Sequence, residues 1–229
     1  MARRDMPANL ADCATSFMAT DALGRLTGGR AQLYILRTAD TVICRCHVSL
    51  SDEIAAKLQA VAARPRGRPR EWAGEYADYL TILSAVGPIK SMRAGPLYTF
   101  ADLGGSGVAA TVIGADNADL LSGGLDEWRQ DAHAGLPMMA IVRDGRAVSI
   151  CTSAAVSQTA HSAGVETLAA YRGRGFARQA VAAWARAVQT LGAVPFYATT
   201  FDNLSSQRVA SRLGLDLIGS EFSVECESG

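Results

Sequence analysis

The segment from Tyr171 to Ala177 holds the residue types of this chain that are best suited to bind an anion. Its two glycines allow a tight turn and a close approach of the backbone to a ligand. The apolar periodicity predicts a helix from Phe176, and the first N–H groups of a helix have no partner within it. With the helix dipole and the side chains of Arg172 and Arg174, these groups would form a cradle for a pyrophosphate. A glycine-rich turn that binds nothing remains an alternative.

The elements that would position this segment follow one another regularly from residue 138 onward. Asp144-Gly145 is a two-residue hairpin signal between strands at 138–143 and 146–156. The later elements are strands at 164–168, 195–200 and 216–224, with helices from Phe176 and at 205–213. The apolar face of the long helix would contain Ala177, Val181, Trp184, Val188 and Leu191. A strand–helix–strand crossover makes its two strands parallel neighbours, so the order predicts a mixed sheet with helices packed on it.

Two motifs in this region resemble those of the GNAT superfamily of acyl-CoA-dependent N-acyltransferases. The family's motif Q/R-x-x-G-x-G/A is matched by Arg172, Gly175 and Ala177. Its second motif, Asn-x-x-Ser followed by Lys/Arg-x-Gly-Phe/Leu, is matched by residues 203–206 and 212–215. The resemblance covers roughly residues 108–224 and places both motifs in the family's order.

The resemblance implies an α/β (α+β) fold in which a mixed sheet has two splayed central parallel strands flanked by helices. These strands would be 164–168 and 195–200, and the pantetheine arm of acetyl-CoA, or of another acyl-CoA, would lie between them as a co-substrate. The implied binding residues are Thr167, Leu168, Arg172, Gly173, Arg174, Gly175, Phe176, Ala177, Asn203 and Ser206. For Asn203, a simple helix N-cap is a compatible alternative.

The implied chemistry is direct attack of an amine on the thioester, which needs a base and donors for the oxyanion. In several family members the base lies eleven residues before the first motif position, which is His161 here. Glu166 is the other candidate, and on a regular strand the two side chains point to opposite faces. A bulge near Thr167, expected from the resemblance, would weaken that distinction. We favour Glu166, because His161 stands at the predicted start of its strand, where side chains are often solvated.

One position departs from the family pattern. Many members carry a tyrosine acid four residues after the motif serine, where this chain has Ala210. Tyr197, on the neighbouring predicted strand, is a possible substitute for that acid. The missing tyrosine also keeps open an alternative function, a non-catalytic acyl-CoA-binding module for regulation or assembly. The sequence does not support a mononucleotide-binding domain, because the glycine-rich segment 171–177 lacks the Lys-Ser/Thr of a P-loop.

The acceptor is expected to be a small-molecule amine. In this fold its pocket comes from the helices and loops before the first hairpin, here residues 116–136. Asp126, Glu127 and Trp128 are candidates for its lining, although a solvated helix face is an alternative reading of the acids.

The bulk composition excludes several other classes of protein. The 229 residues carry 22 basic and 22 acidic side chains, so neither a nucleic acid nor a membrane surface is an expected partner. The five cysteines lack the spacing of a zinc or redox site, which indicates no metal and a reducing, cytoplasmic compartment. No stretch approaches the roughly 20 apolar residues of a membrane span. A homodimer remains possible.

The sequence before residue 96 carries no recognisable motif. We expect residues 1–95 to form a smaller N-terminal α+β unit of unknown role, and residues 96–229 to form the acyltransferase domain. Strands are predicted at 31–37 and 41–49, and a helix at 52–63 begins after Ser51 as N-cap. A basic loop, 64–70, precedes a helix with Trp72 and Tyr79 on its apolar stripe.

Overall fold

A computed structural model of the chain describes residues 10–64, 76–101 and 109–227. Contacts between residues divide the chain into two compact units. Unit 1 comprises Met1–Leu97, Ala198–Asn203 and Leu217–Gly229, and unit 2 comprises Tyr98–Tyr197 and Leu204–Asp216. Most of the predicted loop at 64–70, and Trp72, lie outside the described residues.

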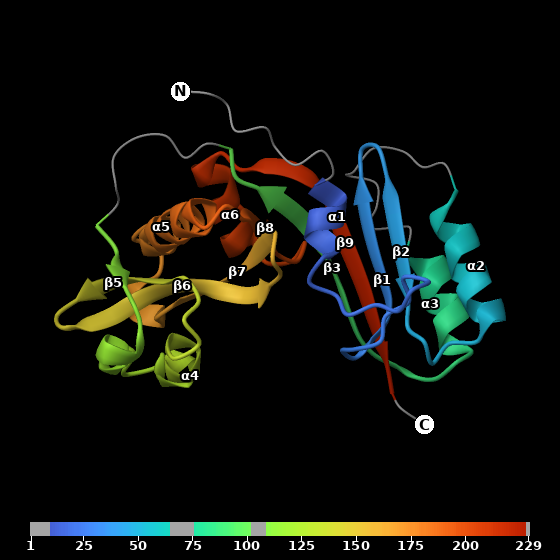
Figure 1. Ribbon diagram of the computed structural model, residues 1–229, viewed down its shortest axis with the longest axis horizontal. Coiled ribbons are helices and arrows are strands. Elements are labelled where there is room, and N and C mark those ends of the chain that lie inside the picture. Colours follow the sequence, from blue (N-terminus) through green and yellow to red (C-terminus); the bar gives the residue numbers. More distant parts are fainter. Residues whose placement is uncertain (1–9, 65–75, 102–108, 228–229) are drawn as a thin grey trace. The chain divides into compact units, whose positions relative to one another are not determined.

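Unit 1 contains four strands in the order β2-β1-β9-β3. Their bounds are Val42–Cys46 for β2, Ala31–Thr38 for β1, Asp216–Cys226 for β9 and Ile89–Thr99 for β3. Strand β1 pairs antiparallel with both β2 and β9. The helices of unit 1 are α1 (Leu10–Thr15), α2 (Asp52–Ala62) and α3 (Ala77–Ser84) (Figure 1).

The core of unit 1 lies between these strands and the helices α2 and α3. Alternate residues of β1 and β9, such as Leu33 and Phe222, meet Leu58 of α2 and Leu83 of α3 in one buried cluster. As predicted, α2 begins after Ser51, whose Oγ accepts a hydrogen bond from the N–H of Ile54 at 3.3 Å.

Unit 2 is a mixed sheet with strand order β8-β7-β6-β5-β4. The bounds are Val194–Ala198 for β8, Ala160–Thr167 for β7, Arg146–Val156 for β6, Met138–Arg143 for β5 and Thr111–Val112 for β4. All neighbouring pairs are antiparallel except β7 and β8, which are parallel, as the crossover rule predicted. In the hairpin between β5 and β6, Asp144 and Gly145 both have positive φ (50° and 74°), as a type I′ turn requires.

Helices cover both faces of the sheet in unit 2. The long helix α5 (Phe176–Thr190) and α6 (Leu204–Leu213) pack on one face. The short helices η2 (Ala115–Leu120), η3 (Asp126–Trp128) and α4 (Arg129–Ala132) pack on the other. Figure 1 shows α5 and α4 on opposite sides of β5 and β6.

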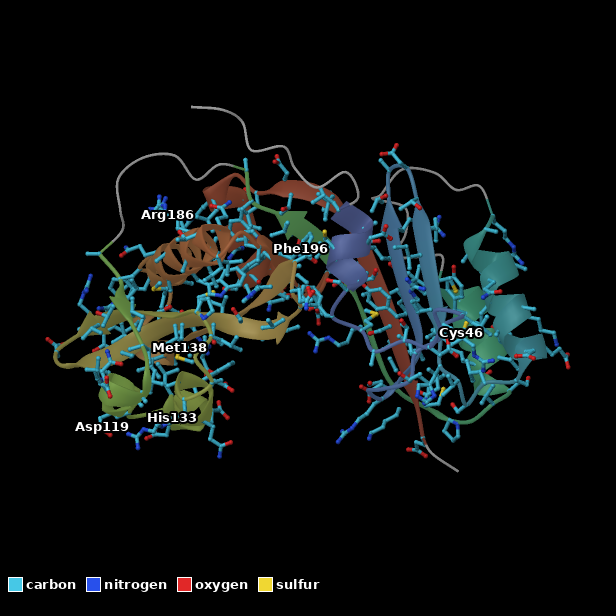
Figure 2. All side chains as sticks on the ribbon, in the orientation of Figure 1. Cys46, Asp119, His133, Met138, Arg186 and Phe196 are labelled. Carbon is cyan, nitrogen blue, oxygen red and sulfur yellow. The ribbon has the colours of Figure 1, made fainter. Side chains whose placement is uncertain are left out.

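Strand β5 contributes side chains to both faces of the sheet in unit 2. Met138, labelled in Figure 2, and Ala140 belong to the cluster under η2 and α4, whereas Ile141 packs in the cluster under α5. This alternation is the period of two that a strand imposes on its side chains. It gives unit 2 two distinct faces, and a side chain of β7 must lie on one or the other.

Two features differ from the sequence-based expectation. The units do not divide at a single point between residues 95 and 96, because β9 pairs with β1 and so carries residues 217–229 into unit 1. Leu191, predicted on the apolar face of the long helix, is 64% exposed, because it follows the last turn of α5.

Candidate functional site

The parallel strands β7 and β8 pair only at their beginnings. Their register joins Ala160, His161 and Ser162 to Val194, Pro195 and Phe196, while β7 continues to Thr167. The N–H of Leu168 donates to the carbonyl of Val148 at 3.0 Å, on the side of β6. Backbone groups alternate between the two edges of a strand, so those of Val165 and Thr167 point to the other edge, beyond the pairing with β8. This part of β7 is an open edge on which an extended ligand can pair.

The two backbone positions that the resemblance indicated differ in their availability. The N–H of Leu168 is engaged by Val148, and its carbonyl accepts a hydrogen bond from the N–H of Tyr171 at 2.8 Å. Thr167 has its backbone on the open edge, where its carbonyl accepts from Arg172 Nε at 3.1 Å. Val165, which the sequence did not single out, shares that edge. Only the register of β6 and β7 could identify it.

The glycine-rich segment enters α5 through two left-handed residues. Gly173 and Gly175 have φ of 78° and 80°, and Gly175 is the N-cap of α5 without a side-chain cap. The first hydrogen bond of the helix runs from the N–H of Gln179 to the carbonyl of Gly175, so the N–H groups of Phe176, Ala177 and Arg178 have no partner within the helix. A Cβ built on Gly173 or Gly175 would meet no atom within 4 Å. The space over the segment is therefore open, and its donors suit a phosphate.

Four arginines surround this segment. Arg172 and Arg174 belong to it, whereas Arg143 and Arg146 flank the turn of the β5–β6 hairpin. The guanidinium carbon of Arg174 lies 5.2 Å from the ring centroid of Tyr171, that of Arg146 lies 5.8 Å from the same ring, and that of Arg143 lies 4.8 Å from the Phe176 ring.

Among the described residues, no carboxylate forms an ion pair with these four guanidinium groups; the ion pairs found there involve other cations. They therefore concentrate positive charge beside the start of α5 in a chain whose net charge is zero. The sequence analysis missed Arg143 and Arg146. The two arginines on either side of Asp144-Gly145 were the available signal, but only the fold brings them to the glycine-rich segment.

The second motif leads into α6. Asn203 immediately precedes this helix and is the last residue of the segment 198–203, which belongs to unit 1. The Oγ of Ser206 lies 2.6 Å from the hydroxyl of Tyr197. Ala210, at the position of the family's tyrosine acid, is fully buried in the core under α5.

Tyr197 is itself buried in that core. Burial raises its pKa to about 12, although the hydrogen bond with Ser206 opposes the shift. Such a phenol stays neutral near pH 7 and gives up its proton reluctantly. Its geometry suits a hydrogen-bond donor better than a proton source for a leaving thiolate.

His161 lies under α5. Contrary to our expectation of a solvated strand start, β7 begins at Ala160 and pairs with β8 from that residue, so His161 is only 6% exposed. Its Nδ1 lies 2.8 Å from the Oγ of Ser153, and this Oγ accepts a hydrogen bond from the indole N–H of Trp184 at 3.0 Å. Burial lowers the pKa of His161 below its ordinary 6.5.

This burial makes His161 a pH-dependent element of stability. A histidine with a lowered pKa in the folded state contributes stability that is present above about pH 6.5 and lost as the pH falls, because the unfolded chain takes up the proton first. We expect His161→Asn, which keeps a polar atom near Nδ1 but cannot be protonated, to remove part of this acid sensitivity. Denaturant unfolding at pH 7.5 and 5.5 measures the effect. His133→Asn, at the exposed histidine labelled beside α4 in Figure 2, is the control. Equal pH dependence in all three proteins would contradict the expectation.

Glu166 lies on the opposite face of β7, towards η3. Its Oε2 accepts a hydrogen bond from the indole N–H of Trp128 at 2.6 Å, and the carboxylate is partly exposed. The expected bulge near Thr167 does not occur in β7, because its register with β6 is continuous from Ala163 to Thr167. The register shift lies in β6, between Ser153 and Ala155. The parity argument therefore holds, and only Glu166 faces η3 and α4.

Two absences concern the part of the chain that the structure describes. No group of three or more His, Cys, Asp or Glu side chains there could hold a metal ion. None of the helices in these residues combines the length and the apolar character of a membrane span.

Comparisons with known proteins agree with this architecture. Residues 133–220 match the family model described as GNAT acetyltransferase. No curated protein matches the sequence.

Several solved structures are similar to the chain. A GCN5-related N-acetyltransferase-like protein from Streptococcus suis 89/1591 has 17% identity and a TM-score of 0.53, with 92% of this chain and 88% of that chain covered. A putative acetyltransferase from the GNAT family of Novosphingobium aromaticivorans has 14% identity and a TM-score of 0.50, with coverage of 62% and 67%. A GNAT-family acetyltransferase from Colwellia psychrerythraea has 12% identity and a TM-score of 0.48, with 66% of this chain covered; this chain spans 62% of that protein.

Proposed function

We propose that this chain transfers an acetyl group from acetyl-CoA to a primary amine, because residues 133–220 match the family model described as GNAT acetyltransferase. The acceptor would be a small molecule or an amino-acid-like compound. The observation that carries the proposal is the glycine-capped start of α5 next to the open edge of β7.

Binding of acetyl-CoA would use groups that the fold leaves available. The N–H groups at the start of α5 would hold the pyrophosphate, with Arg172 and Arg174 adding charge. Open space over Gly173 and Gly175 supports this role, because any side chain there would compete with the phosphates. The backbone groups of Val165 and the N–H of Thr167 would pair with the amides of the pantetheine arm as an added strand does. Asn203 and Ser206 would contribute from the start of α6.

The chemistry would take place on the face of β7 that carries Glu166. Its carboxylate would accept the amine proton, directly or through one water, as the amine attacks the thioester carbonyl. Backbone N–H donors would stabilise the oxyanion. Holding the two reactants in line would supply much of the rate, because effective molarities of positioned reactants reach about 10⁵–10⁸ M.

The segment over this face suggests a cationic acceptor. Asp126 is engaged within the segment, because its carboxylate accepts from the N–H of Gly124 at 3.1 Å and pairs with Arg129 at 3.3 Å. Glu127 beside it is exposed, so its charge is accessible to an amine in solution.

All five cysteines are free thiols, which supports a reducing compartment such as the cytoplasm.

The first test of the proposal is binding and turnover of acetyl-CoA. A ligand that binds only the folded state stabilises it by about 2.7 kcal/mol at a concentration 100 times Kd, so the melting temperature should rise and saturate with acetyl-CoA. Release of free thiol in the presence of a panel of primary amines then measures transfer, with reactions lacking an amine as the control. Saturable binding without thiol release for any amine would favour the alternative, a non-catalytic acyl-CoA-binding module. Absence of binding would overturn both.

A further inference from the structure

The carboxylate of Glu166 is held by a single side chain. Trp128, which lies 38 residues earlier in the sequence, donates its indole N–H to Glu166 Oε2 at 2.6 Å. Within the described residues this is the only side-chain hydrogen bond of the carboxylate. An indole nitrogen can only donate, so the contact favours the carboxylate as an acceptor and leaves Oε1 uncommitted.

The position of the indole ring is determined by the strand beneath it. Gly164 precedes Glu166 by two residues and therefore shares its face of β7. A Cβ built on Gly164 would lie 3.6 Å from Cη2 of Trp128 and 3.0 Å from the Cβ of Ala154. The edge of the ring therefore lies over the strand at Gly164, on the same face as the carboxylate.

The segment that carries Trp128 is anchored on both sides of the ring. Leu125 and Ala132 are buried in the cluster under η2 and α4, and Trp128 packs against that cluster. Arg129 Nε donates to the carbonyl of Leu121 at 2.9 Å. These contacts restrict the indole to one place, which in turn restricts the rotamers of Glu166.

We infer that Trp128 is a positioning residue for the acyl transfer, and this inference rests on the proposed function. It holds Oε2 so that Oε1 points to the reacting amine or its water. In the step it supports, the amine nitrogen forms the new C–N bond, its proton passes to Oε1, and the C–S electron pair leaves with the thiolate. Trp128 does not touch the transferred proton. Its role is to keep the carboxylate in line, where a misplacement of about 1 Å can cost on the order of 100-fold in rate.

The test is a double-mutant cycle between Trp128 and Glu166. Trp128→Phe keeps an aromatic ring over Gly164 but removes the N–H donor. We expect kcat to fall on the order of 10-fold to 100-fold, with the affinity for acetyl-CoA unchanged. In a Glu166→Gln background, where no base remains to be positioned, the same substitution should have little further effect, because two groups that act together are not additive.

Trp184→Phe is the matched control. Trp184 donates its indole N–H to the Oγ of Ser153 on the α5 face of the sheet, away from Glu166. Removing this donor should leave kcat unchanged. An equal loss from Trp128→Phe in both backgrounds would overturn the inference and assign the ring to packing or acceptor binding. Wild-type kcat in Trp128→Phe, or in Glu166→Gln, would also overturn it. The proposed function fails separately, through absent acetyl-CoA binding or absent thiol release in the unsubstituted protein.

Discussion

Gly175→Glu should abolish binding of acetyl-CoA while the chain still folds. Gly175 caps α5, and a Cβ there would enter open space, so no core contact is lost. The new carboxylate would reach the free N–H groups at the start of the helix and occupy the place of the phosphates. Hydrogen bonds to charged groups contribute about 1.5–3 kcal/mol each. The loss of two such bonds between the helix N–H groups and the phosphates would therefore weaken binding by at least about 100-fold. Isothermal titration with acetyl-CoA measures this change.

Gly192→Glu separates the loss of the site from backbone strain. Gly192 follows the other end of α5, has φ of 83°, and also has no atom within 4 Å of a built Cβ. Both variants therefore force a non-glycine residue into the left-handed region, at a similar cost of about 1–2 kcal/mol. Because α5 has 15 residues, its ends are about 22 Å apart at 1.5 Å per residue. Gly192→Glu should melt lower but bind acetyl-CoA normally. Unchanged affinity in Gly175→Glu would move the phosphate site elsewhere.

Glu166→Gln should lower kcat by about 10²- to 10⁴-fold, the usual contribution of a general base. Glutamine keeps the size of the side chain and can still accept from the indole of Trp128, so packing is preserved while the proton acceptor is lost. Affinity for acetyl-CoA should stay within about twofold, because the carboxylate lies on the face opposite α5. Steady-state kinetics with the best amine of the panel measures kcat, and isothermal titration with acetyl-CoA measures the affinity.

His161→Asn distinguishes the two candidate bases. Motif spacing pointed to His161, but this side chain is buried under α5 beside Ser153. Its substitution should therefore affect stability and leave kcat nearly unchanged when both proteins are assayed well below their melting temperatures. If His161→Asn instead lowered kcat by about 10²- to 10⁴-fold and Glu166→Gln did not, His161 would be the general base. If both variants stayed fully active, water would be the proton acceptor, and positioning alone would account for the rate.

The sequence by itself determined the local elements of unit 2, including the glycine-rich turn into α5. The observed bounds of β5 and β6 and the start of α5 equal the predicted ones, because hairpin, glycine and apolar signals act over a few residues. The parallel pairing of β7 and β8 followed from the order strand, helix, strand, because the helix between them returns the chain to the end of the sheet where the first strand began. The glycine-rich turn was predictable for the same reason, since the glycines, the arginines and the helix start lie within seven residues.

Only the tertiary structure decided which side chains share a face and which distant segments meet. His161 and Glu166 lie five residues apart, and neither spacing nor residue type showed which face of β7 would be covered by α5. The contact of Glu166 with Trp128 joins residues 38 positions apart, and the approach of Arg146 to Tyr171 depends on the register of β6 and β7. The pairing of β9 with β1, which carries the end of the chain into unit 1, joins residues still more distant in sequence. Such contacts depend on packing between elements, which local propensity does not encode.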